Sequence, residues 1–419
     1  MKNKIQTLKG FRDFLPGEKR KRDYVISKIK EVFDLYGFEP LETPTLEYAS
    51  LLLGKYGEEA DKLVYKFKDR GGREVALKYD QTVPTARILA QYQNQLPKYF
   101  RRYQIQNVFR ADNPQKGRYR EFTQCDIDIF GSSSPLADAE ILACTYFAIK
   151  NIFPNNVSVK IFINERQSLI ELLKPFTNDK VDVYSIIRSL DKLDKLPKDQ
   201  VKQELEQKGL SEEQVENIFE QTQSTSPPEK IKKIIELAEG LGIPKDIVIQ
   251  YSNILARGLD YYTGMIFEVT IVKGGSLIYV GSIAGGGRYD NLIKQLGGID
   301  VPAVGVAFGL DRIIEAADQL KLISVKKTDA QVLVITFEET LNECLQIANR
   351  LRQSSIKTEL YPAIESLDKQ LKYADKKGIP YVVIVGKEEV KQNKITLKNM
   401  KTREQKLLSI EEAIKTIKS

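Results

Sequence analysis

Apolar residues recur at helical spacing near the start of the chain, within residues 18–36. The positions that share one helical face are Val25, Ile29, Val32, Phe33 and Tyr36. The next segment, "GFEPLETPTLEY", contains a glycine and two prolines and is predicted to be extended. A second helix is expected from Thr82, with Thr82 as its N-cap and Pro84 in its first turn.

Alternating apolar and polar residues predict antiparallel strands in the first third of the chain. One hairpin is expected to pair residues near 62–67 with 74–79 across a Gly-Gly turn. A longer hairpin is expected to pair 99–110 with 119–130 across a loop rich in Arg, Lys and Gly. These strands predict an α+β domain built on an antiparallel sheet flanked by helices.

The middle of the chain changes character. Residues 165 to about 250 are rich in Lys, Glu, Gln and Leu and are predicted to be a helical insertion. Strands are expected again at 265–272 and 277–283, followed by Gly-rich turns. The segment "AVGVAFGLDRIIEAA" is typical of a strand that runs into a helix.

A domain boundary is expected within "SVKKTDA", residues 324–330. Beyond it, strand patterns such as "QVLVITF" and "YVVIVG" alternate with helical ones, which predicts a small α/β domain with parallel strands. We therefore expect one domain at 1–324 and a second at 325–419.

Composition narrows the function classes. The chain has 64 Lys and Arg against 57 Asp and Glu, and residues 326–419 carry +5 of the net +7, with 18 basic and 13 acidic residues. Such an excess is compatible with nucleic acid but is common in other proteins. No secretory signal and no run of about 18 apolar residues is present. Three cysteines without C-x-x-C spacing argue against a disulfide framework and a thiolate zinc site, so we expect a cytoplasmic protein without membrane contact.

The chain contains no histidine, which excludes a Ser-His-Asp triad, a Cys-His pair and HExxH zinc sites. It also lacks a G-x-x-x-x-G-K-[ST] phosphate loop and a G-x-G-x-x-G motif that opens a helix after a strand. A nucleotide would therefore bind on an antiparallel sheet and be held by arginines.

The long hairpin, "VFRADNPQKGRYREFTQCDIDIF", offers such arginines. Arg110 ends its first strand, and on the second strand Gln124 and Asp128 share a face, where both approach a small cationic or hydrogen-bonding group. A solvated face with an exposed basic turn is the plainer interpretation. The Phe122 side chain on that face and the planar guanidinium groups favour a phosphate ligand.

Three further segments combine polar and glycine residues. "LARGLDYYTG" places Arg257, Tyr261 and Tyr262 in a Gly-bounded turn, which is otherwise an ordinary loop with core tyrosines. "SIAGGGRYDNLI" allows close backbone approach to a ligand, although a tight connection is its commoner explanation. "GVAFGLDRI" places Arg312 at a helix start, where it would face a phosphate or its own acidic neighbour.

The segment "KYDQTVP" contributes Asp80 and Thr82. Each either caps the helix that follows or points back at a bound ammonium group. The sequence pattern favours neither alternative.

Taken in order, these segments resemble the class II aminoacyl-tRNA synthetases. The arginine hairpin is similar to the second motif of that class, "GVAFGLDR" to its third, and "GFEPLETPTLE" with the preceding helix to its first, which builds the dimer interface. "LARGLDYYTG", "GSIAGGGRYD", "KGFRDFLP" and "LKYDQTVPTARILA" resemble the histidyl-tRNA synthetase family in particular, along the whole chain.

The resemblance implies a role for each matching residue. The amino group of the amino acid would be bound by Asp80, Thr82 and Gln124, and the imidazole ring by Asp128 with Tyr261 and Tyr262. Catalysis would fall to Arg257 and Arg110. ATP would be bound by Arg110, Asp112, Arg118 and Arg312, with Asp112 standing where the family usually has Glu.

The implied reaction joins L-histidine to the 3′ end of tRNA(His), with ATP as energy source and Mg²⁺ on its phosphates. The metal ligands are not implied by any motif. A homodimer and an anticodon-binding C-terminal domain are further implications. The alternative is a non-catalytic paralogue, similar to an ATP phosphoribosyltransferase regulatory subunit, which typically lacks the C-terminal domain.

Overall fold

In a computed structural model of the chain, the described residues are 5–53, 63–114, 117–153, 157–194, 196–224, 226–246, 248–256, 261–273, 276–277, 281–297 and 299–418. They fall into two compact units. The first comprises Met1–Asp13 and Arg22–Ile323, and the second comprises Phe14–Lys21 and Ser324–Ser419. No helix among these residues is long and apolar enough to cross a membrane.

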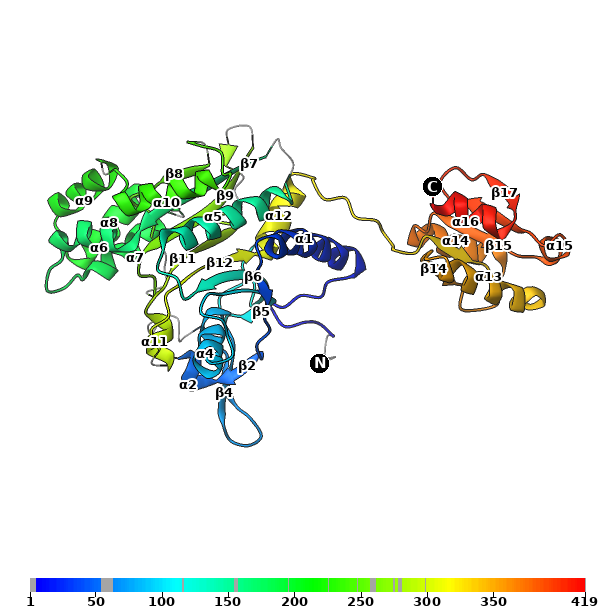
Figure 1. Ribbon diagram of the computed structural model, residues 1–419, viewed down its shortest axis with the longest axis horizontal. Coiled ribbons are helices and arrows are strands. Elements are labelled where there is room, and N and C mark those ends of the chain that lie inside the picture. The colour runs from blue at the N-terminus through cyan, green and yellow to red at the C-terminus, as the bar shows by residue number, and fades with distance from the viewer. Residues whose placement is uncertain are drawn as a thin grey trace. The chain divides into compact units, whose positions relative to one another are not determined.

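A large, mostly antiparallel sheet organises the first unit (Figure 1). In order across the sheet, its described strands are β1 (Glu39–Pro40), β5 (Phe100–Phe109), β6 (Glu121–Phe130), β12 (Ala303–Gly309), β11 (Ala284–Arg288), β9 (Met265–Lys273), β7 (Ser158–Glu165) and β8 (Ile249–Tyr251), with β10 (Ser276–Leu277) paired to β9. The long hairpin β5–β6 is confirmed and lies beside β12.

One face of this sheet carries the main hydrophobic core. The helices that contribute to it are α1 (Pro16–Leu35), α5 (Pro135–Lys150), α10 (Glu229–Gly240) and α12 (Leu310–Gln319), which Figure 1 shows on the same side of the strands. The predicted apolar face of α1 is confirmed, because Val25, Ile29, Val32 and Phe33 are buried there. Cys125, Ile127 and Ile129 of β6 point into this core, so the polar residues that alternate with them lie on the opposite face.

The opposite face is covered at its edge by α4 (Thr82–Tyr92) and α11 (Leu292–Gly297), which pack around Phe100 and Phe130. Beside them lie α2 (Ala49–Leu52) and a small sheet of order β2 (Leu46–Tyr48), β4 (Glu74–Leu77) and β3 (Lys66–Lys68). The short hairpin is thus confirmed as β3–β4, with shorter strands than expected.

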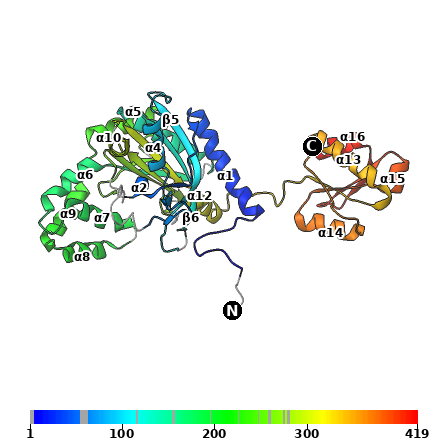
Figure 2. The ribbon, with the colours of Figure 1, turned by 90° about the horizontal axis from the view of Figure 1, so that it is seen from below.

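The helical stretch expected from 165 to about 250 is not one structural element. The helices of its first part share a hydrophobic core of their own and form one group at one end of the sheet (Figure 2). The elements are α6 (Arg166–Leu173), η1 (Lys174–Phe176), α7 (Val183–Leu190), η2 (Asp191–Asp194), α8 (Lys198–Lys208) and α9 (Glu212–Ser224). The remainder returns to the main body, because Ile231 and Ile234 of α10 enter the main core and β8 pairs in parallel with β7.

The glycines of "AGGGR" form a central strand and not a turn, contrary to the sequence-based expectation. All five residues of β11 are buried between β12 and β9. Arg288 ends this strand and is buried against Asp138 of α5, to which its Nε donates over 3.0 Å. Arg288 therefore holds α5 to the sheet from the core side.

This buried ion pair makes a stability prediction. Replacing Asp138 by alanine would leave the buried Arg288 charge with only Asp290, 3.2 Å from its Nη1, and we expect a loss of about 3 kcal/mol in the free energy of unfolding. Denaturant unfolding followed by circular dichroism measures it. The matched control is Lys233→Ala, which removes an exposed ion pair with Glu236 and should change stability by less than about 0.5 kcal/mol. Equal effects of the two substitutions would contradict the prediction.

The second unit contains a mixed five-stranded sheet of order β14 (Thr358–Leu360), β13 (Val332–Val334), β15 (Tyr381–Ile384), β16 (Ile395–Asn399) and β17 (Gln405–Leu408). Its helical elements are η3 (Glu338–Thr340), α13 (Leu341–Gln353), α14 (Leu367–Lys377), α15 (Lys387–Lys391) and α16 (Ile410–Lys418). The expected parallel pairing holds for the first three strands, whereas β16 and β17 pair antiparallel. The chain reaches these last two strands without the long crossover that a parallel strand needs.

Candidate active site

A polar surface lies on the sheet face opposite the main core. Strand register places three pairs directly across from each other, namely Arg102 and Asp128, Gln104 and Asp126, and Gln106 and Gln124. The next strand, β12, adds only glycine and alanine on this face, at Gly305, Ala307 and Gly309. A floor of small residues thus lies beside a row of polar ones.

Asp128 is a buried acceptor on this surface, with 4% of its surface exposed. It accepts a hydrogen bond from the Tyr289 hydroxyl, and its other oxygen lies 2.5 Å from Nη2 of Arg102. Burial raises the pKa of Asp128, while Arg102 and the Tyr289 hydrogen bond oppose that rise. The carboxylate is therefore held in one orientation by two groups from different strands.

Tyrosine rings enclose the same end of the surface. The rings of Tyr261 and Tyr262 lie 4.6 Å apart between centroids, and Tyr261 meets Tyr289 edge-on at 5.6 Å. The two predicted tyrosines are thus brought beside Asp128. Tyr289 was missed in the sequence analysis because "SIAGGGRYDNLI" was interpreted as a turn. Had the segment been interpreted as a strand, alternation would have placed Tyr289 on the same face as Gly287, two residues earlier.

Two glycines are required by close approach to these side chains. A Cβ at Gly305 would lie 1.8 Å from Oδ1 of Asp128, and one at Gly287 would lie 2.9 Å from the Tyr262 ring. Any side chain at either position would displace the group above it. Of these two, Gly287 belongs to the "AGGGR" strand and Gly305 to the neighbouring β12.

Asp80 lies in the turn before α4, with 6% of its surface exposed. Its carboxylate accepts from the backbone N–H of Val83 over 3.2 Å, so Asp80 meets the helix N-terminus. Thr82 is the first helical residue, and the N-cap position belongs to Gln81, so the expectation that Thr82 caps α4 was wrong. Burial raises the pKa of Asp80 to about 6, against the opposing effects of the helix N–H groups and Arg110.

Gln81 joins this turn to the sheet. Its Nε2 donates to the backbone carbonyl of Gln124 over 3.0 Å, which brings Asp80 and Thr82 next to Gln124. The Oε1 atoms of Gln81 and Gln124 are both buried and make no hydrogen bond within the described parts of the chain. Because buried polar atoms are normally paired, these acceptors indicate a place where a ligand donor would bind.

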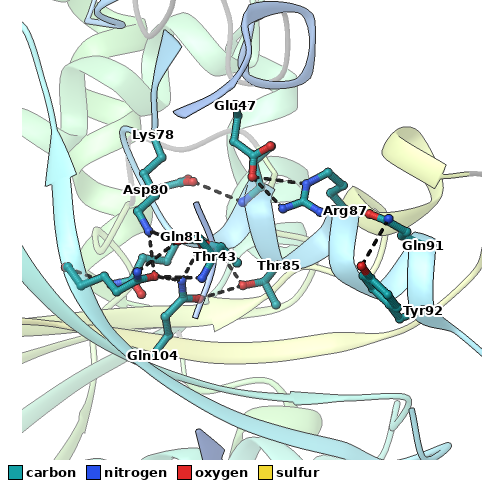
Figure 3. A network of polar contacts seen from close by, with 12 residues as sticks. Thr43, Glu47, Lys78, Asp80, Gln81, Thr85, Arg87, Gln91, Tyr92 and Gln104 are labelled. Carbon is teal, nitrogen blue, oxygen red and sulfur yellow. Dashed lines mark hydrogen bonds and ion pairs between the residues drawn. The ribbon is translucent and has the colours of Figure 1, made fainter. Parts of the chain in front are cut away.

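A network of polar side chains supports the turn from beneath (Figure 3). Lys78 is fully buried and donates to the Thr43 carbonyl over 3.1 Å and to Gln106 over 2.7 Å. Gln104 donates to the Thr43 hydroxyl over 2.8 Å and accepts from Thr85 of α4 over 3.1 Å. Burial lowers the pKa of Lys78 to about 8. The network fixes the start of α4 to strand β5.

Arg110 lies at the other end of the polar surface. Its Nε donates to the Tyr79 carbonyl over 3.0 Å, and its guanidinium lies 5.1 Å from the Phe122 ring centroid. The arginine is thereby aimed from the strand end toward the turn that contains Asp80. Phe122 on the polar face, which had argued against a solvated surface, is the platform for this guanidinium.

Arg118 and Asp112 face each other in the hairpin loop, with 3.7 Å between Nε and Oδ2, and Arg118 is half-exposed. Arg312 begins α12 and donates to the Ser282 carbonyl over 2.7 Å. A Cβ at Gly309, which pairs with Gln124, would lie 3.6 Å from the Arg312 side chain. Arg312 therefore lies over the Arg110 end of the polar surface.

The neighbour of Arg312 anchors this helix. Asp311 accepts from Arg12 over 2.8 Å and also pairs with Arg22 of α1. Arg22 in turn donates to Thr123 of β6 over 2.9 Å. The acidic neighbour of Arg312 is thus paired with two other arginines.

One predicted residue is not placed in this site. Arg257 lies outside the described residues. Among the residues that are described, no group of three or more Cys, Asp and Glu side chains is arranged to hold a metal ion.

Comparisons with known proteins cover the whole length of the chain. A family model described as "Histidyl-tRNA synthetase" matches residues 10–313, and one described as "Anticodon binding domain" matches residues 330–419.

The histidine–tRNA ligase of Gloeobacter violaceus is 38% identical over 459 residues, and that of Wolinella succinogenes is 39% identical over 433 residues. Each alignment covers 97% of this chain and 97% of the relative. The crystal structure of histidyl-tRNA synthetase from Nostoc sp. PCC 7120 is 31% identical, covers 100% of this chain and 99% of that one, and superposes with a TM-score of 0.82. These likenesses confirm the class II synthetase fold. The chain belongs to the histidyl-tRNA synthetase family.

Proposed function

We propose that the polar surface of the large sheet is where this chain joins histidine to tRNA. The chain is a histidine–tRNA ligase, an aminoacyl-tRNA synthetase that uses ATP. The observation that carries the assignment to this surface is the placement of Asp128. It is a buried carboxylate held beside three tyrosines, on the same face that Arg110 and Arg312 reach.

Histidine would lie along strand β6. Its imidazole ring would bind between Asp128 and the tyrosines Tyr261, Tyr262 and Tyr289, where a carboxylate and hydroxyls pair with both ring nitrogens. Its amino group would bind at Asp80, Thr82 and Gln124, where the described acceptors converge. Apolar analogues would leave these buried groups unpaired, which can give discrimination of about 10⁴-fold.

ATP would bind at the arginine end. The first step is an in-line attack of the histidine carboxylate on the α-phosphorus, which releases diphosphate. An ionised carboxylate needs no general base, so a chain without histidine can catalyse this step by positioning and by positive charge. We assign Arg110 and Arg257 to the α-phosphate and Arg118 and Arg312 to the outer phosphates.

Mg²⁺ would be bound mainly by ATP, because this ion usually keeps phosphate and water ligands and takes only one or two carboxylates. Asp112 in the hairpin loop is a carboxylate suited to that role, and the described residues offer no dedicated cage. The ion would neutralise charge on the phosphates.

In the second step the histidyl group passes to the terminal ribose of the tRNA. The adenylate phosphate would accept the ribose proton, so this step also requires no imidazole of the enzyme. The C-terminal domain, with its charge of +5 over residues 326–419, would contact the tRNA backbone and read anticodon bases.

We also propose a homodimer in the cytoplasm. Three large apolar side chains of the small sheet, Leu46, Tyr48 and Phe67, are about half-exposed and would be covered by a second copy. The three cysteines, Cys125, Cys144 and Cys344, are buried and free, as is usual in a reducing compartment. Sedimentation at several concentrations tests the dimer.

The pKa of Asp80 predicts a pH dependence. Only the ionised carboxylate attracts the ammonium group of histidine, and its pKa is raised to about 6. We therefore expect kcat/KM for histidine to fall as the pH drops through about 6, by up to tenfold per pH unit. The substrate imidazole titrates in the same range, so the ratio of wild type to Asp80→Asn isolates the enzyme group. A ratio that does not vary between pH 5.5 and 8 would refute this assignment.

The test of the function is ATP–pyrophosphate exchange with each of the twenty amino acids. We expect exchange with histidine and none with the others. Transfer of labelled histidine to tRNA(His) then distinguishes a ligase from a non-catalytic paralogue. A chain that binds tRNA without any exchange would overturn the proposal.

A further inference from the structure

Arg102 is an arginine in the interior of the sheet. It lies in the middle of β5, and none of its surface is exposed. Arginine is almost never fully buried without a paired charge, because taking it out of water is costly. Because burial of Arg102 on the candidate binding surface is costly, we looked for the group that its charge acts on.

The strand register aims Arg102 at the carboxylate that would bind the substrate ring. Arg102 and Asp128 are direct cross-strand partners, and Nη2 lies 2.5 Å from Oδ2. None of its guanidinium nitrogens makes a well-aligned hydrogen bond with any residue described in the structure. The contact is thus an ion pair that orients Asp128 from the side opposite to Tyr289.

Three buried carboxylates lie close together on this surface. Asp80, Asp126 and Asp128 are all buried on it, and Arg102 acts on all three. Burial raises the pKa of Asp126 well above its usual value, and Oδ1 of Asp126 has no hydrogen-bond partner among the described residues. Arg102 forms its ion pair with Asp128, its direct cross-strand partner.

We propose that Arg102 is a positioning residue that holds Asp128 as an oriented carboxylate and thereby sets the affinity of the enzyme for the imidazole ring. The inference rests on the proposed function, since it assigns the ring to Asp128. Arg102 itself would not touch the substrate. It would act by holding Oδ2 of Asp128. The other oxygen, Oδ1, which accepts from Tyr289, would then face the ring nitrogen of the substrate.

The first test is Arg102→Met, which removes the charge and keeps a long side chain. Histidine-dependent pyrophosphate exchange should show KM for histidine raised at least about tenfold, with KM for ATP changed by less than about threefold. Arg102→Lys keeps a cation and should recover much of the loss. Arg102→Gln carries the test if the methionine variant does not fold. The matched control is Arg101→Met, one position along β5 on the other face, where Arg101 pairs with Glu140.

A double-mutant cycle separates positioning from a general structural role. If Arg102 acts through Asp128, then Arg102→Met in an Asp128→Asn background should cost less than about threefold in KM for histidine. Full additivity of the two substitutions would overturn the proposal.

The pH dependence gives a third readout. Without Arg102, the pKa of Asp128 should be higher, so the histidine defect of Arg102→Met should shrink towards the alkaline end of the pH range in which exchange can be measured. The groups that face Asp128 or its neighbour Asp126 are Arg102, Arg110, Lys78, Asp80 and Tyr289. A defect that is constant over this range would contradict the role assigned to Arg102.

Calorimetric titration of histidine, together with exchange, distinguishes a failure of the proposed function from a failure of the role assigned to Arg102. A wild-type chain that neither binds histidine nor exchanges with it overturns both proposals. A wild-type chain that does both, with an Arg102→Met variant that matches it, overturns only the role of Arg102.

Discussion

Replacing Arg110 by glutamine is expected to lower kcat/KM for ATP in histidine-dependent exchange by about 10²–10³-fold. The guanidinium is held by the Tyr79 carbonyl and by the Phe122 ring, so it is fixed before the substrate arrives. A fixed charge requires no reorganisation when negative charge grows at the α-phosphorus. Glutamine keeps a donor but not the charge or the planar fork.

The substitution should change the kinetic constants for ATP and leave the binding of histidine to the free enzyme unchanged. Histidine binding measured by calorimetry is expected to change by less than about threefold. Arg101→Gln, on the same strand but on the core face beside Glu140, is the control and should retain exchange. If Arg110→Gln weakened histidine binding as much as catalysis, Arg110 would belong to the amino-acid site and our assignment would be wrong.

Replacing Asp128 by asparagine is expected to lower kcat/KM for histidine by about 10²–10³-fold. The substitution keeps the shape of the side chain but removes the charge that Arg102 and Tyr289 hold in place. It also leaves Arg102 buried without its counter-ion. Steady-state exchange at varied histidine concentration measures the loss.

Asp126→Asn is the matched control for Asp128→Asn. Asp126 is two residues away on the same strand and face, and burial raises its pKa well above the usual value. Asparagine keeps the shape of the side chain, and Asp126 has no contact assigned to the substrate, so this variant should change kcat/KM for histidine by less than about threefold. Equal losses from the two variants would show that the surface responds to any change in charge and not to Asp128 in particular.

Periodicity was sufficient for the elements that bury one face. The helix that became α1 and the hairpin β5–β6 were predictable because an apolar stripe with the right period must face a core. The same reasoning failed for β11. Its "AGGGR" sequence has no apolar period, and it is a strand because it pairs with β12 on one side and β9 on the other.

Local signals were also insufficient near the site. Thr82 has the residue type of an N-cap and is followed by a proline at a suitable position, yet the carboxylate that meets the helix N-terminus belongs to Asp80. The polar network around Thr43 and Gln104 decides where α4 begins. Such a network joins residues that are far apart in the sequence, so no local pattern reports it.

The sequence by itself determined the family and the order of the motifs, because residue type and spacing are local properties. The tertiary structure alone decided that Tyr289 and Arg102 flank Asp128 and that Arg288 belongs to the core. These pairings depend on which strands lie side by side and on which face each side chain emerges. Strand order and register arise from packing between distant segments, and a one-residue shift in register would reverse every face.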